Sequence, residues 1–257
     1  MLIAIDCGNT QTVVGLYRGD ELLEPWRLHT NPERTSDEHA LLLRQLLGLQ
    51  QLSFADVSGV VVSSTVPRLT AALREMAERY FSVPPTVLEP GVRTGMPILY
   101  ENPKEVGPDR IANAVGAYGL YGGPVLVVDF GTATTIDATS AAGEYLGGAI
   151  LPGIEISLDA LFARAAALSR IKLAEPRRVI GKSTVESVQS GTFFGFGAAV
   201  DGLCRRFQAE LGPCSVVSTG GLGELMLPYC ESIGEYRPWL TLHGLRLIYE
   251  RNRAVVP

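Results

Sequence analysis

Short apolar runs that end in a polar residue and a glycine alternate along the chain with stretches of helical periodicity. Residues 2–5 form such a run, and β-branched residues resume at 12–17 after a turn that contains glycine, which predicts a hairpin. Leucines spaced along one helix face predict a helix over 37–49, with Ser36 as its N-cap. The chain therefore opens with a β-hairpin that is followed by a helix.

The same order of elements occurs twice. The first half continues with a valine-rich strand at 59–63, a helix at 67–80 and a loop at 84–108 that is rich in Pro and Gly. The elements of the second half are a helix at 107–121, a buried strand at 125–128, its hairpin partner at 134–139 and a late valine-rich strand that starts at 216. We expect one lobe over residues 1–110 and a second over 111–257.

A simple offset relates the two halves. Moving the sequence by 123 residues places Asp6 on Asp129 and Thr12 on Thr135, so that an Asp-x-Gly sequence closes an apolar strand in both copies. Each half also contains a later valine-rich strand that ends in small residues. This pattern favours two similar α/β lobes around a cleft.

The composition is that of a well-buried globular protein. Of the 257 residues, 46% are hydrophobic and 19% are charged, which excludes wholesale disorder. The 22 basic and 27 acidic residues give a net charge of -5, so nucleic acid is not an expected partner. No apolar run approaches the roughly 18 residues that span a bilayer, and the four cysteines form no CxxC pair, as expected in the reducing cytoplasm.

The first glycine turn carries groups suited to phosphate. A glycine turn after a buried strand exposes backbone N–H groups, and a carboxylate before it can hold a cation against a phosphate. Asp6 and Gly8 provide these two parts, while Asn9, Thr10 and Thr12 add side-chain donors. A hairpin whose Asp and Asn satisfy their own turn amides would have the same sequence, so both interpretations fit this turn alone.

A second turn over 129–135 repeats this chemistry, and two such turns suggest a nucleotide. A third Gly-rich segment at 218–223 could pack its backbone against a flat adenine or ribose, or could be a tight strand-to-helix turn. The Gly-Lys-Ser sequence at 181–183 resembles the end of a Walker A loop. The first glycine of that motif would fall on Pro176, which excludes a P-loop.

Asp109 and Arg110 stand together at the start of a predicted helix. Asp109 could take a proton from a hydroxyl nucleophile, and the guanidinium of Arg110 could hold an anionic group. An Asp near a helix N-terminus is also a common cap, and an Arg beside it is usually solvated. Both interpretations fit this motif by itself.

Taken together, these segments resemble the type III pantothenate kinase family. The resemblance covers nearly the whole chain and rests on motifs that occur in order, namely IDCGNT, GPDRIANAVGAY, VVDFGTATTID, GGAILPG, TVESVQSGTFFG and STGGLG. It implies an α/β fold of two duplicated RNase H-like lobes, of the actin-like ATPase kind, with mixed sheets flanked by helices. It also implies ATP-dependent phosphorylation of pantothenate to 4'-phosphopantothenate, the first committed step toward coenzyme A.

The resemblance further implies an ATP site along the two turns. Asp6 would hold Mg²⁺, directly or through water, and Thr132 would contact the nucleotide from the second turn. Asp129 matches the position that binds a monovalent cation, K⁺ or NH₄⁺. The residues implied to contact ATP or its phosphates in the first turn are Asp6, Cys7, Gly8, Asn9, Thr10, Gln11, Thr12 and Val13.

Asp109 corresponds to the proposed general base of the family, and Arg110 would meet the substrate carboxylate. The implied pantothenate site comprises Tyr100, Gly107, Pro108, Asp109, Arg110 and Thr184. From the residues alone, Tyr100 could instead pack a loop and Thr184 could cap the helix that follows it. Family members commonly have Ala where this chain has Pro108, but Pro is tolerated in the first turn of a helix, so we expect Asp109 to keep its place.

The family is dimeric, and the resemblance implies a homodimer whose pantothenate site is completed at the interface around Thr184. Residues 187–204, with Phe193, Phe194 and Phe196, could supply an apolar helix face for that interface. An internal core has the same periodicity and is favoured by the pattern alone. The homodimer therefore rests on the resemblance.

Other functions also fit the two turns. Another small-molecule kinase, or a phosphatase acting on a nucleotide or polyphosphate, would share the fold. A noncatalytic nucleotide-dependent regulator would bind ATP without turnover of pantothenate. The motifs GPDR and TVESVQSG have no obvious use in a pure nucleotide switch and argue against that regulator.

Overall fold

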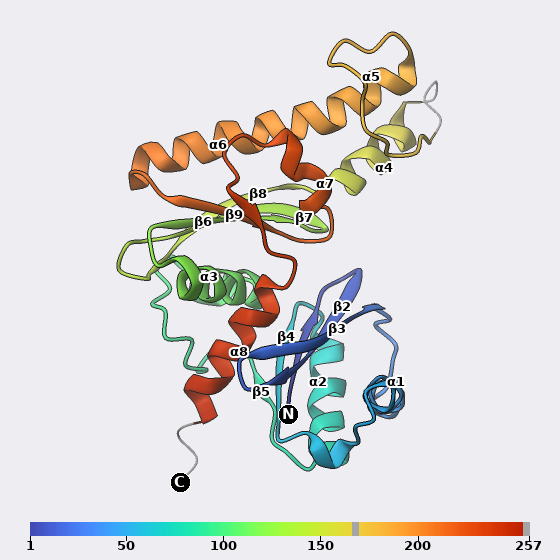
Figure 1. Cartoon of the computed structure of the whole chain (residues 1–257), viewed down its shortest axis with the longest axis vertical. Helices are drawn as coiled ribbons and strands as arrows, with labels where there is room; N and C mark the ends of the chain where they lie inside the picture. The colour runs from blue at the N-terminus through green and yellow to red at the C-terminus, as the bar shows by residue number, and fades with distance from the viewer. Residues whose placement is uncertain (166–169, 254–257) are drawn as a thin grey trace. The chain divides into compact units, whose positions relative to one another are not determined.

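The computed structural model describes residues 1–165 and 170–253, which form two compact units (Figure 1). The first unit contains residues 1–119 together with the chain from 239 onward, and the second contains residues 120–238. Each unit is built on one five-stranded mixed sheet. The prediction of two α/β lobes with mixed sheets and flanking helices is confirmed. None of the helices in the described ranges has the length and apolar character needed to cross a membrane.

The first unit takes elements from both ends of the chain. Its strands are β1 (Leu2–Cys7), β2 (Gln11–Arg18), β3 (Glu21–His29), β4 (Gly59–Ser64) and β5 (Thr86–Val87). Its α-helices are α1 (Ser36–Leu49), α2 (Pro67–Met76), α3 (Pro108–Tyr121), whose last two residues belong to the second unit, and α8 (Leu240–Arg253). The shorter helical turns are η1 (Phe54–Asp56), η2 (Ala77–Phe81) and η3 (Pro103–Glu105).

The second unit is a continuous segment of the chain. Its strands are β6 (Val125–Phe130), β7 (Ala133–Thr139), β8 (Tyr145–Pro152), β9 (Ser215–Thr219) and β10 (Glu235–Tyr236). Its helices are α4 (Ile154–Arg164), α5 (Thr184–Ser190), η4 (Gly191–Gly195), α6 (Phe196–Leu211), α7 (Gly223–Met226) and η5 (Leu227–Tyr229).

The two sheets share one topology. The strand order is β3-β2-β1-β4-β5 in the first sheet and β8-β7-β6-β9-β10 in the second. In each sheet the central strand pairs antiparallel with its hairpin partner and parallel with a later strand, β4 or β9. The duplication predicted from the Asp-x-Gly repeats is therefore present in the order and direction of the strands.

The simple offset is wrong at one position, because the second hairpin turn is one residue shorter. Thr12 pairs with Cys7 in the first hairpin, and the matching pair in the second hairpin joins Phe130 to Thr134. Thr12 is therefore the counterpart of Thr134 and not of Thr135. Both of these threonines are buried, as expected for residues at equivalent places in a sheet.

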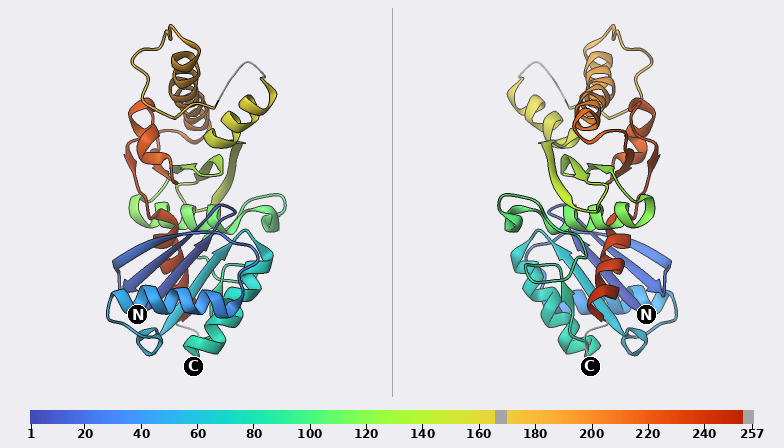
Figure 2. Two further views of the ribbon diagram at one scale, coloured as in Figure 1. Left: turned by 90° about the vertical axis from the view of Figure 1, so that its right-hand side faces the viewer. Right: turned by 90° about the vertical axis from the view of Figure 1, so that its left-hand side faces the viewer.

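Helices cover both faces of the first sheet (Figure 2). α1 and α2 cover one face, where Ile3, Ile5 and Val62 of the strands are buried in a core with Leu43 of α1 and Leu69 and Leu73 of α2. α8 packs against β1, β2 and β4 on the opposite face. Burial of apolar surface between these layers is the main source of stability in such a fold.

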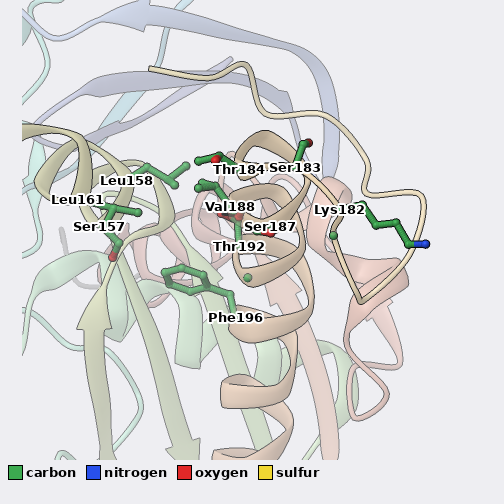
Figure 3. A pocket seen from close by; sticks show the side chains of 12 residues that line it. Ser157, Leu158, Leu161, Lys182, Ser183, Thr184, Ser187, Val188, Thr192 and Phe196 are labelled. Carbon is green, nitrogen blue, oxygen red and sulfur yellow. Dashed lines mark hydrogen bonds between the residues drawn. The ribbon is translucent and has the colours of Figure 1, made fainter. Parts of the chain in front are cut away.

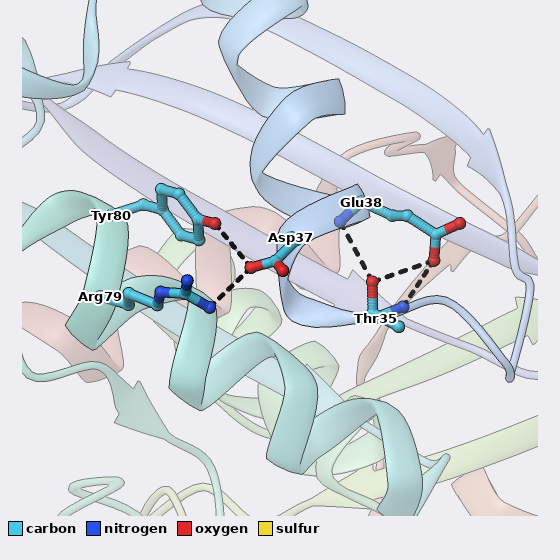
Figure 4. A network of polar contacts seen from close by, with 5 residues as sticks. All are labelled: Thr35, Asp37, Glu38, Arg79 and Tyr80. Carbon is cyan, nitrogen blue, oxygen red and sulfur yellow. Dashed lines mark hydrogen bonds and ion pairs between the residues drawn. The ribbon is translucent and has the colours of Figure 1, made fainter.

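α1 starts at Ser36, but its N-cap is Thr35 and not Ser36 as predicted. The hydroxyl of Thr35 accepts the N–H of Glu38 at 3.3 Å, and the carboxylate of Glu38 accepts the N–H of Thr35 at 2.8 Å (Figure 4). These bonds lower the pKa of Glu38. They form a capping box, which satisfies two backbone donors at once and outcompetes the single bond that a serine cap would make.

Asp37, in the first turn of α1, joins this helix to η2. Its Oδ1 accepts hydrogen bonds from Arg79 at 2.8 Å and from the hydroxyl of Tyr80 at 2.6 Å (Figure 4). The helix predicted over 67–80 is thus α2 up to Met76, followed by one π-helical turn that presents these two side chains to α1. Such exposed ion pairs contribute little free energy but fix the orientation of the helices.

α3 and α8 approach closely where two glycines face each other. A Cβ on Gly116 would lie 2.7 Å from the carbonyl oxygen of Leu240, and a Cβ on Gly244 would overlap the carbonyl oxygen of Ala112. The hydroxyl of Thr241 donates to Oδ1 of Asn113 at 2.7 Å beside this contact. α8 therefore fixes α3, the helix that starts at Pro108, within the first unit.

The units differ from the predicted lobes at both ends. The lobes were expected to meet at residue 110, whereas α3 stays with the first unit as far as residue 119. The chain from 239 onward was expected in the second lobe but is part of the first unit, because α8 packs on α3 and on the first sheet. Residues 166–169 and 254–257 of the predicted second lobe lie outside the described residues.

We expect Gly244→Ala to lower the free energy of unfolding by about 1–3 kcal/mol, because the added Cβ meets rigid backbone at Ala112. Gly48→Ala in α1 is the matched control, since nothing lies within 4 Å of a Cβ at that position. The control should be neutral or stabilising by up to about 1 kcal/mol, the helix-propensity gain of Ala over Gly. Urea unfolding followed by circular dichroism measures both. Equal stabilities for the two variants would contradict close packing of α3 on α8.

Candidate functional site

The first predicted phosphate turn lies where β1 ends. Asp6 pairs with Val13 of β2 and with Ser63 of β4, so its position is fixed on two sides by sheet hydrogen bonds. Asn9 and Thr10 follow as exposed residues of the turn. The turn is closed by the N–H of Gly8, which donates to the carbonyl of Gln11 at 3.0 Å. The structure thus presents a half-buried carboxylate beside an exposed loop of polar side chains.

Two predicted contacts of this turn have buried side chains. The hydroxyl of Thr12 lies 2.8 Å from that of Thr30, which in turn donates to the carbonyl of Gly8 at 2.8 Å. Cys7 is fully buried, and burial raises the pKa of its thiol. The side chains of Thr12 and Cys7 therefore face the interior and support the turn from below.

Thr30 is a residue that the sequence reasoning missed. It follows β3, and its N–H also donates to the carbonyl of Thr10 at 3.0 Å, so it holds both ends of the turn. No motif surrounds it, and its role follows only from the pairing of β3 with β2. The only hint in the sequence was Thr12, a threonine beside the turn whose hydroxyl needs a hydrogen-bond partner.

The second turn lies at the end of β6 in the second unit. Asp129 pairs with Thr135 of β7 and with Thr219 of β9, the same arrangement as that of Asp6. Thr132 is exposed at the tip of the turn. Gly153, the N-cap of α4, lies so close that a Cβ there would sit 2.8 Å from the carbonyl oxygen of Gly131.

The third Gly-rich segment lies against this second turn. Gly220 has a φ of +88°, and a Cβ on it would overlap Oδ1 of Asp129 and lie 2.6 Å from the backbone carbon of Phe130. The N–H of Leu222 donates to the carbonyl of Phe130 at 3.2 Å, and the hydroxyl of Tyr236 donates to the carbonyl of Gly220 at 3.0 Å. Segment 218–223 therefore forms one wall beside Asp129.

Asp109 is the second residue of α3, and Pro108 is the first. A proline at this position has no N–H to leave unsatisfied and a φ suited to a helix, as expected from the sequence. Oδ1 of Asp109 accepts the N–H of Arg110 at 2.9 Å, and Gly107 has no Cβ that would collide with this oxygen. Asp109 is therefore not the N-cap of α3, because it lies inside the helix and its carboxylate accepts the N–H of the very next residue.

The other predicted substrate residues lie in different places. Arg110 is buried, with 8% of its surface exposed, while Tyr100 is half-buried in the loop before η3. Thr184 is exposed at the start of α5 in the second unit. It does not cap that helix, because Oγ of Ser183 accepts the N–H of Glu186 at 3.2 Å.

Thr184 lines an open groove in the second unit (Figure 3). The groove has a volume of about 860 Å³ and runs between α4 on one side and α5, η4 and α6 on the other. Leu158 and Leu161 of α4 face Val188 of α5 across it, and Phe196 lies at one end. Its lining combines apolar side chains with the hydroxyl groups of serines and threonines, a mixture that pockets for small molecules commonly have.

The phenylalanines at 193–196 divide between core and groove. Phe193 is buried in the core of the second unit and packs against Tyr229 in a tilted arrangement, with ring centroids 4.8 Å apart. Phe194 is half-buried against the same tyrosine at 5.4 Å. Phe196 lines the groove. The core interpretation of the apolar stretch is therefore correct for Phe193.

Asp6 and Asp129 are the carboxylates that the resemblance assigns to cations. No group of three or more His, Cys, Asp or Glu side chains within the described ranges could hold a metal by itself. Mg²⁺ in phosphoryl-transfer sites is usually held by one or two carboxylates together with phosphates and water, and Asp6 offers such a carboxylate beside an exposed turn. Asp129 offers a second carboxylate, a type of ligand that hard cations prefer.

Comparison with known proteins identifies the relatives of this chain. A sequence profile of the type III pantothenate kinase family matches residues 2–206. The chain is 54% identical over 255 residues to the type III pantothenate kinase of Myxococcus xanthus strain DK1622, covering 99% of this chain and 100% of that protein. It is also 54% identical over 253 residues to that of Moorella thermoacetica, with 98% and 100% coverage. This chain belongs to the type III pantothenate kinase family.

The fold of this type III pantothenate kinase is also similar to that of proteins with solved structures. Component A of the (R)-2-hydroxyglutaryl-CoA dehydratase of Acidaminococcus fermentans has a TM-score of 0.60 to this chain at 13% identity, and 99% of each chain is covered. A likeness at that identity is a likeness of fold. It agrees with the duplicated RNase H-like lobes that the family resemblance implied.

We expect Gly220→Ala to weaken binding of MgATP at least about tenfold, because the new Cβ displaces the carboxylate of Asp129. Gly212→Ala is the matched control: it has a similar φ of +84°, but nothing lies within 4 Å of a Cβ there. The control should lose about 1–2 kcal/mol of stability from the left-handed backbone and keep its affinity. Calorimetric titration with MgATP measures both variants. Equal losses of affinity would mean that backbone strain, and not the contact with Asp129, is responsible.

Proposed function

We propose that Asp109 is the general base with which this chain transfers the γ-phosphoryl group of ATP to the terminal hydroxyl of pantothenate. As a member of the type III pantothenate kinase family, the chain is a phosphotransferase with an alcohol as acceptor, and it acts in coenzyme A biosynthesis. The observation that supports the role of Asp109 is its rigid position at the start of α3, with Oδ1 bonded to the N–H of Arg110. A carboxylate held in this way keeps its orientation while a substrate binds.

The proposed ATP site uses both glycine turns. The exposed N–H and hydroxyl groups of the first turn, from Asn9 to Gln11, would contact phosphate oxygens, and Thr132 would contact the nucleotide from the second turn. Asp6 would hold Mg²⁺, which supplies charge neutralisation at the phosphates when it is bound. Asp129 would hold K⁺ or NH₄⁺. Phosphoryl transfer asks the protein mainly for positioning and charge stabilisation, and polar turns on rigid strands provide that.

The proposed pantothenate site extends from the start of α3. Gly107, Pro108 and Asp109 would surround the reacting hydroxyl, and the guanidinium of Arg110 would bind the carboxylate of pantothenate through its planar set of donors. Tyr100, in the loop before α3, would contact the same substrate. A cytoplasmic location, where ATP and pantothenate are both available, is part of this proposal.

We further propose that the enzyme is a homodimer in which Thr184 of one subunit completes the pantothenate site of the other. The exposure of Thr184 on the groove wall of the second unit supports this arrangement, since its hydroxyl is presented outward and is not used as a helix cap. Neighbouring exposed apolar side chains, including Val179, Ile180 and Val185, add surface that association would bury.

We expect Asp109→Asn to lower kcat by about 10²–10⁴-fold, because the amide cannot take the proton of the attacking hydroxyl. Asn keeps an oxygen acceptor for the N–H of Arg110, so the start of α3 and the affinity for MgATP should be unchanged. Asp159→Asn, an exposed substitution in α4, is the control and should retain full activity. Pantothenate-dependent release of ADP measures turnover. Full activity of Asp109→Asn would remove the general base from the proposal, and absence of pantothenate-dependent ADP in the unaltered protein would remove the kinase activity itself.

Mixing two inactive variants tests the shared site. If Asp109 and Thr184 act from different subunits, a heterodimer of Asp109→Asn with Thr184→Arg contains one intact and one doubly defective site. Activity should then rise to about a quarter of the unaltered level after the variants are mixed and allowed to exchange subunits, because about half of the dimers are mixed. Each variant incubated alone is the control. No recovery in a mixture that is shown to contain heterodimers would place both residues in the same subunit.

A further inference from the structure

A small cavity lies inside the first unit, between its sheet and α1. Its volume of about 10 Å³ is close to the smallest space that holds one water molecule. Leucine, isoleucine and valine side chains form most of its wall. Among the residues that line it, only His39 of α1 and Thr12 of β2 carry polar side chains.

His39 brings an unsatisfied polar atom to this cavity. The residue is buried, with 4% of its surface exposed, and its Nε2 has no hydrogen-bond partner among the described residues. Burial lowers the pKa of His39 to about 4, so the ring is neutral at neutral pH. A buried imidazole nitrogen without a partner costs free energy, and buried polar atoms in native proteins nearly always have one.

The hydroxyl of Thr12, on the sheet side of the cavity, is the other polar group. The carbonyl of Gly8 can only accept, so the hydroxyl hydrogen of Thr30 is committed to it at 2.8 Å. The 2.8 Å contact between the two hydroxyls must then use the hydrogen of Thr12. Thr12 also lies 3.4 Å from Sγ of the buried Cys7, and with its hydrogen used toward Thr30 it can meet this thiol only as an acceptor. One lone pair of the Thr12 oxygen then remains for a further donor.

We propose that one water molecule fills this cavity and bridges Nε2 of His39 to Oγ1 of Thr12, which makes His39 a positioning residue for the first phosphate turn. The water donates one hydrogen to Thr12, whose hydroxyl donates to Thr30, which donates to the carbonyl of Gly8. The remaining hydrogen of the water, or one of its lone pairs, pairs with Nε2 according to the tautomer of the ring. Each hydroxyl in this chain then makes one bond as donor and at least one as acceptor.

This series of hydrogen bonds connects α1 to the first phosphate turn. The sequence of α1 does not indicate such a role. The turn after Asp6 is exposed, and it is held from below by Thr12 and Thr30. A water fixed by His39 orients the hydroxyl of Thr12 and so limits the motion of the carbonyl of Gly8. We expect this water bridge to affect the binding of ATP and not the chemical step. The expected effect on ATP binding rests on the proposed function.

A crystal structure of the unaltered protein at about 1.5 Å resolution tests the water directly. We expect electron density for one water within about 3.2 Å of both Nε2 of His39 and Oγ1 of Thr12. A cavity without density, or a water bonded to neither atom, would overturn the proposal. This result depends neither on kinase activity nor on any variant folding.

Affinity for MgATP tests the positioning role. His39→Phe removes the polar atom, and it should weaken binding of MgATP about fivefold, the equivalent of one neutral hydrogen bond, while kcat changes less than twofold. His39→Gln can reach the water or Thr12 and should restore most of the affinity. Leu43→Met is the matched control, since it alters the packing of the same cavity without changing a polar group.

Several outcomes separate the possibilities. If Leu43→Met weakens MgATP binding as much as His39→Phe does, or if Gln fails to rescue, His39 only packs the core and the proposal is wrong. If Thr12→Val and His39→Phe have additive effects on affinity when combined, the two side chains are not coupled and the bridge is excluded. If the unaltered protein binds no MgATP, the proposed function fails, while the crystal structure still decides whether the water bridge exists.

Discussion

Backbone pairing of the central strand in each sheet determines where the carboxylates of this protein lie. Asp6 and Asp129 each stand near the end of such a strand, bonded on one side to an antiparallel neighbour and on the other to a parallel one. A residue in that position cannot move without breaking pairs in two directions. The turns beyond the strands can therefore vary, as the one-residue difference between them shows, while the carboxylates keep equivalent places in the two units.

The two turns are supported in different ways, although their sequences look alike. Below the first turn, Thr30 and Thr12 hold the backbone through hydroxyl groups. Beside the second turn, Gly153 and Gly220 come so close that a side chain on either would meet backbone or the carboxylate of Asp129. Side-chain hydroxyl groups thus support the first turn, whereas close backbone approach at glycines, together with backbone hydrogen bonds, supports the second.

The local sequence pattern was enough to predict the hairpins and the valine-rich strands. Their signals, the alternation of polar and apolar residues and the β-branched side chains, lie within a few consecutive residues. The pattern did not predict β3 and β8, which are the edge strands of the two sheets. β3 contains Pro25, and proline is tolerated in a strand only where the strand has one neighbour, while β8 contains Gly147 and Gly148, which weaken the strand signal. Thr30 and the place of α8 depend on contacts between distant parts of the chain. The positions of Asp6, Asp109 and Asp129 followed from motifs, whereas the inward orientation of Thr12 required the register of the hairpin.

The return of the chain to the first unit has a consequence for its synthesis. The side chain of Arg246 in α8 is paired with Asp20, which is 226 residues earlier, and its other partner is Glu250 in its own helix. Because α8 follows the second unit in the chain, one face of the first sheet stays uncovered during translation until the entire second unit has emerged. The second unit, being continuous, is free to fold as soon as it leaves the ribosome. The first unit therefore starts to be made before the second unit and is completed after it.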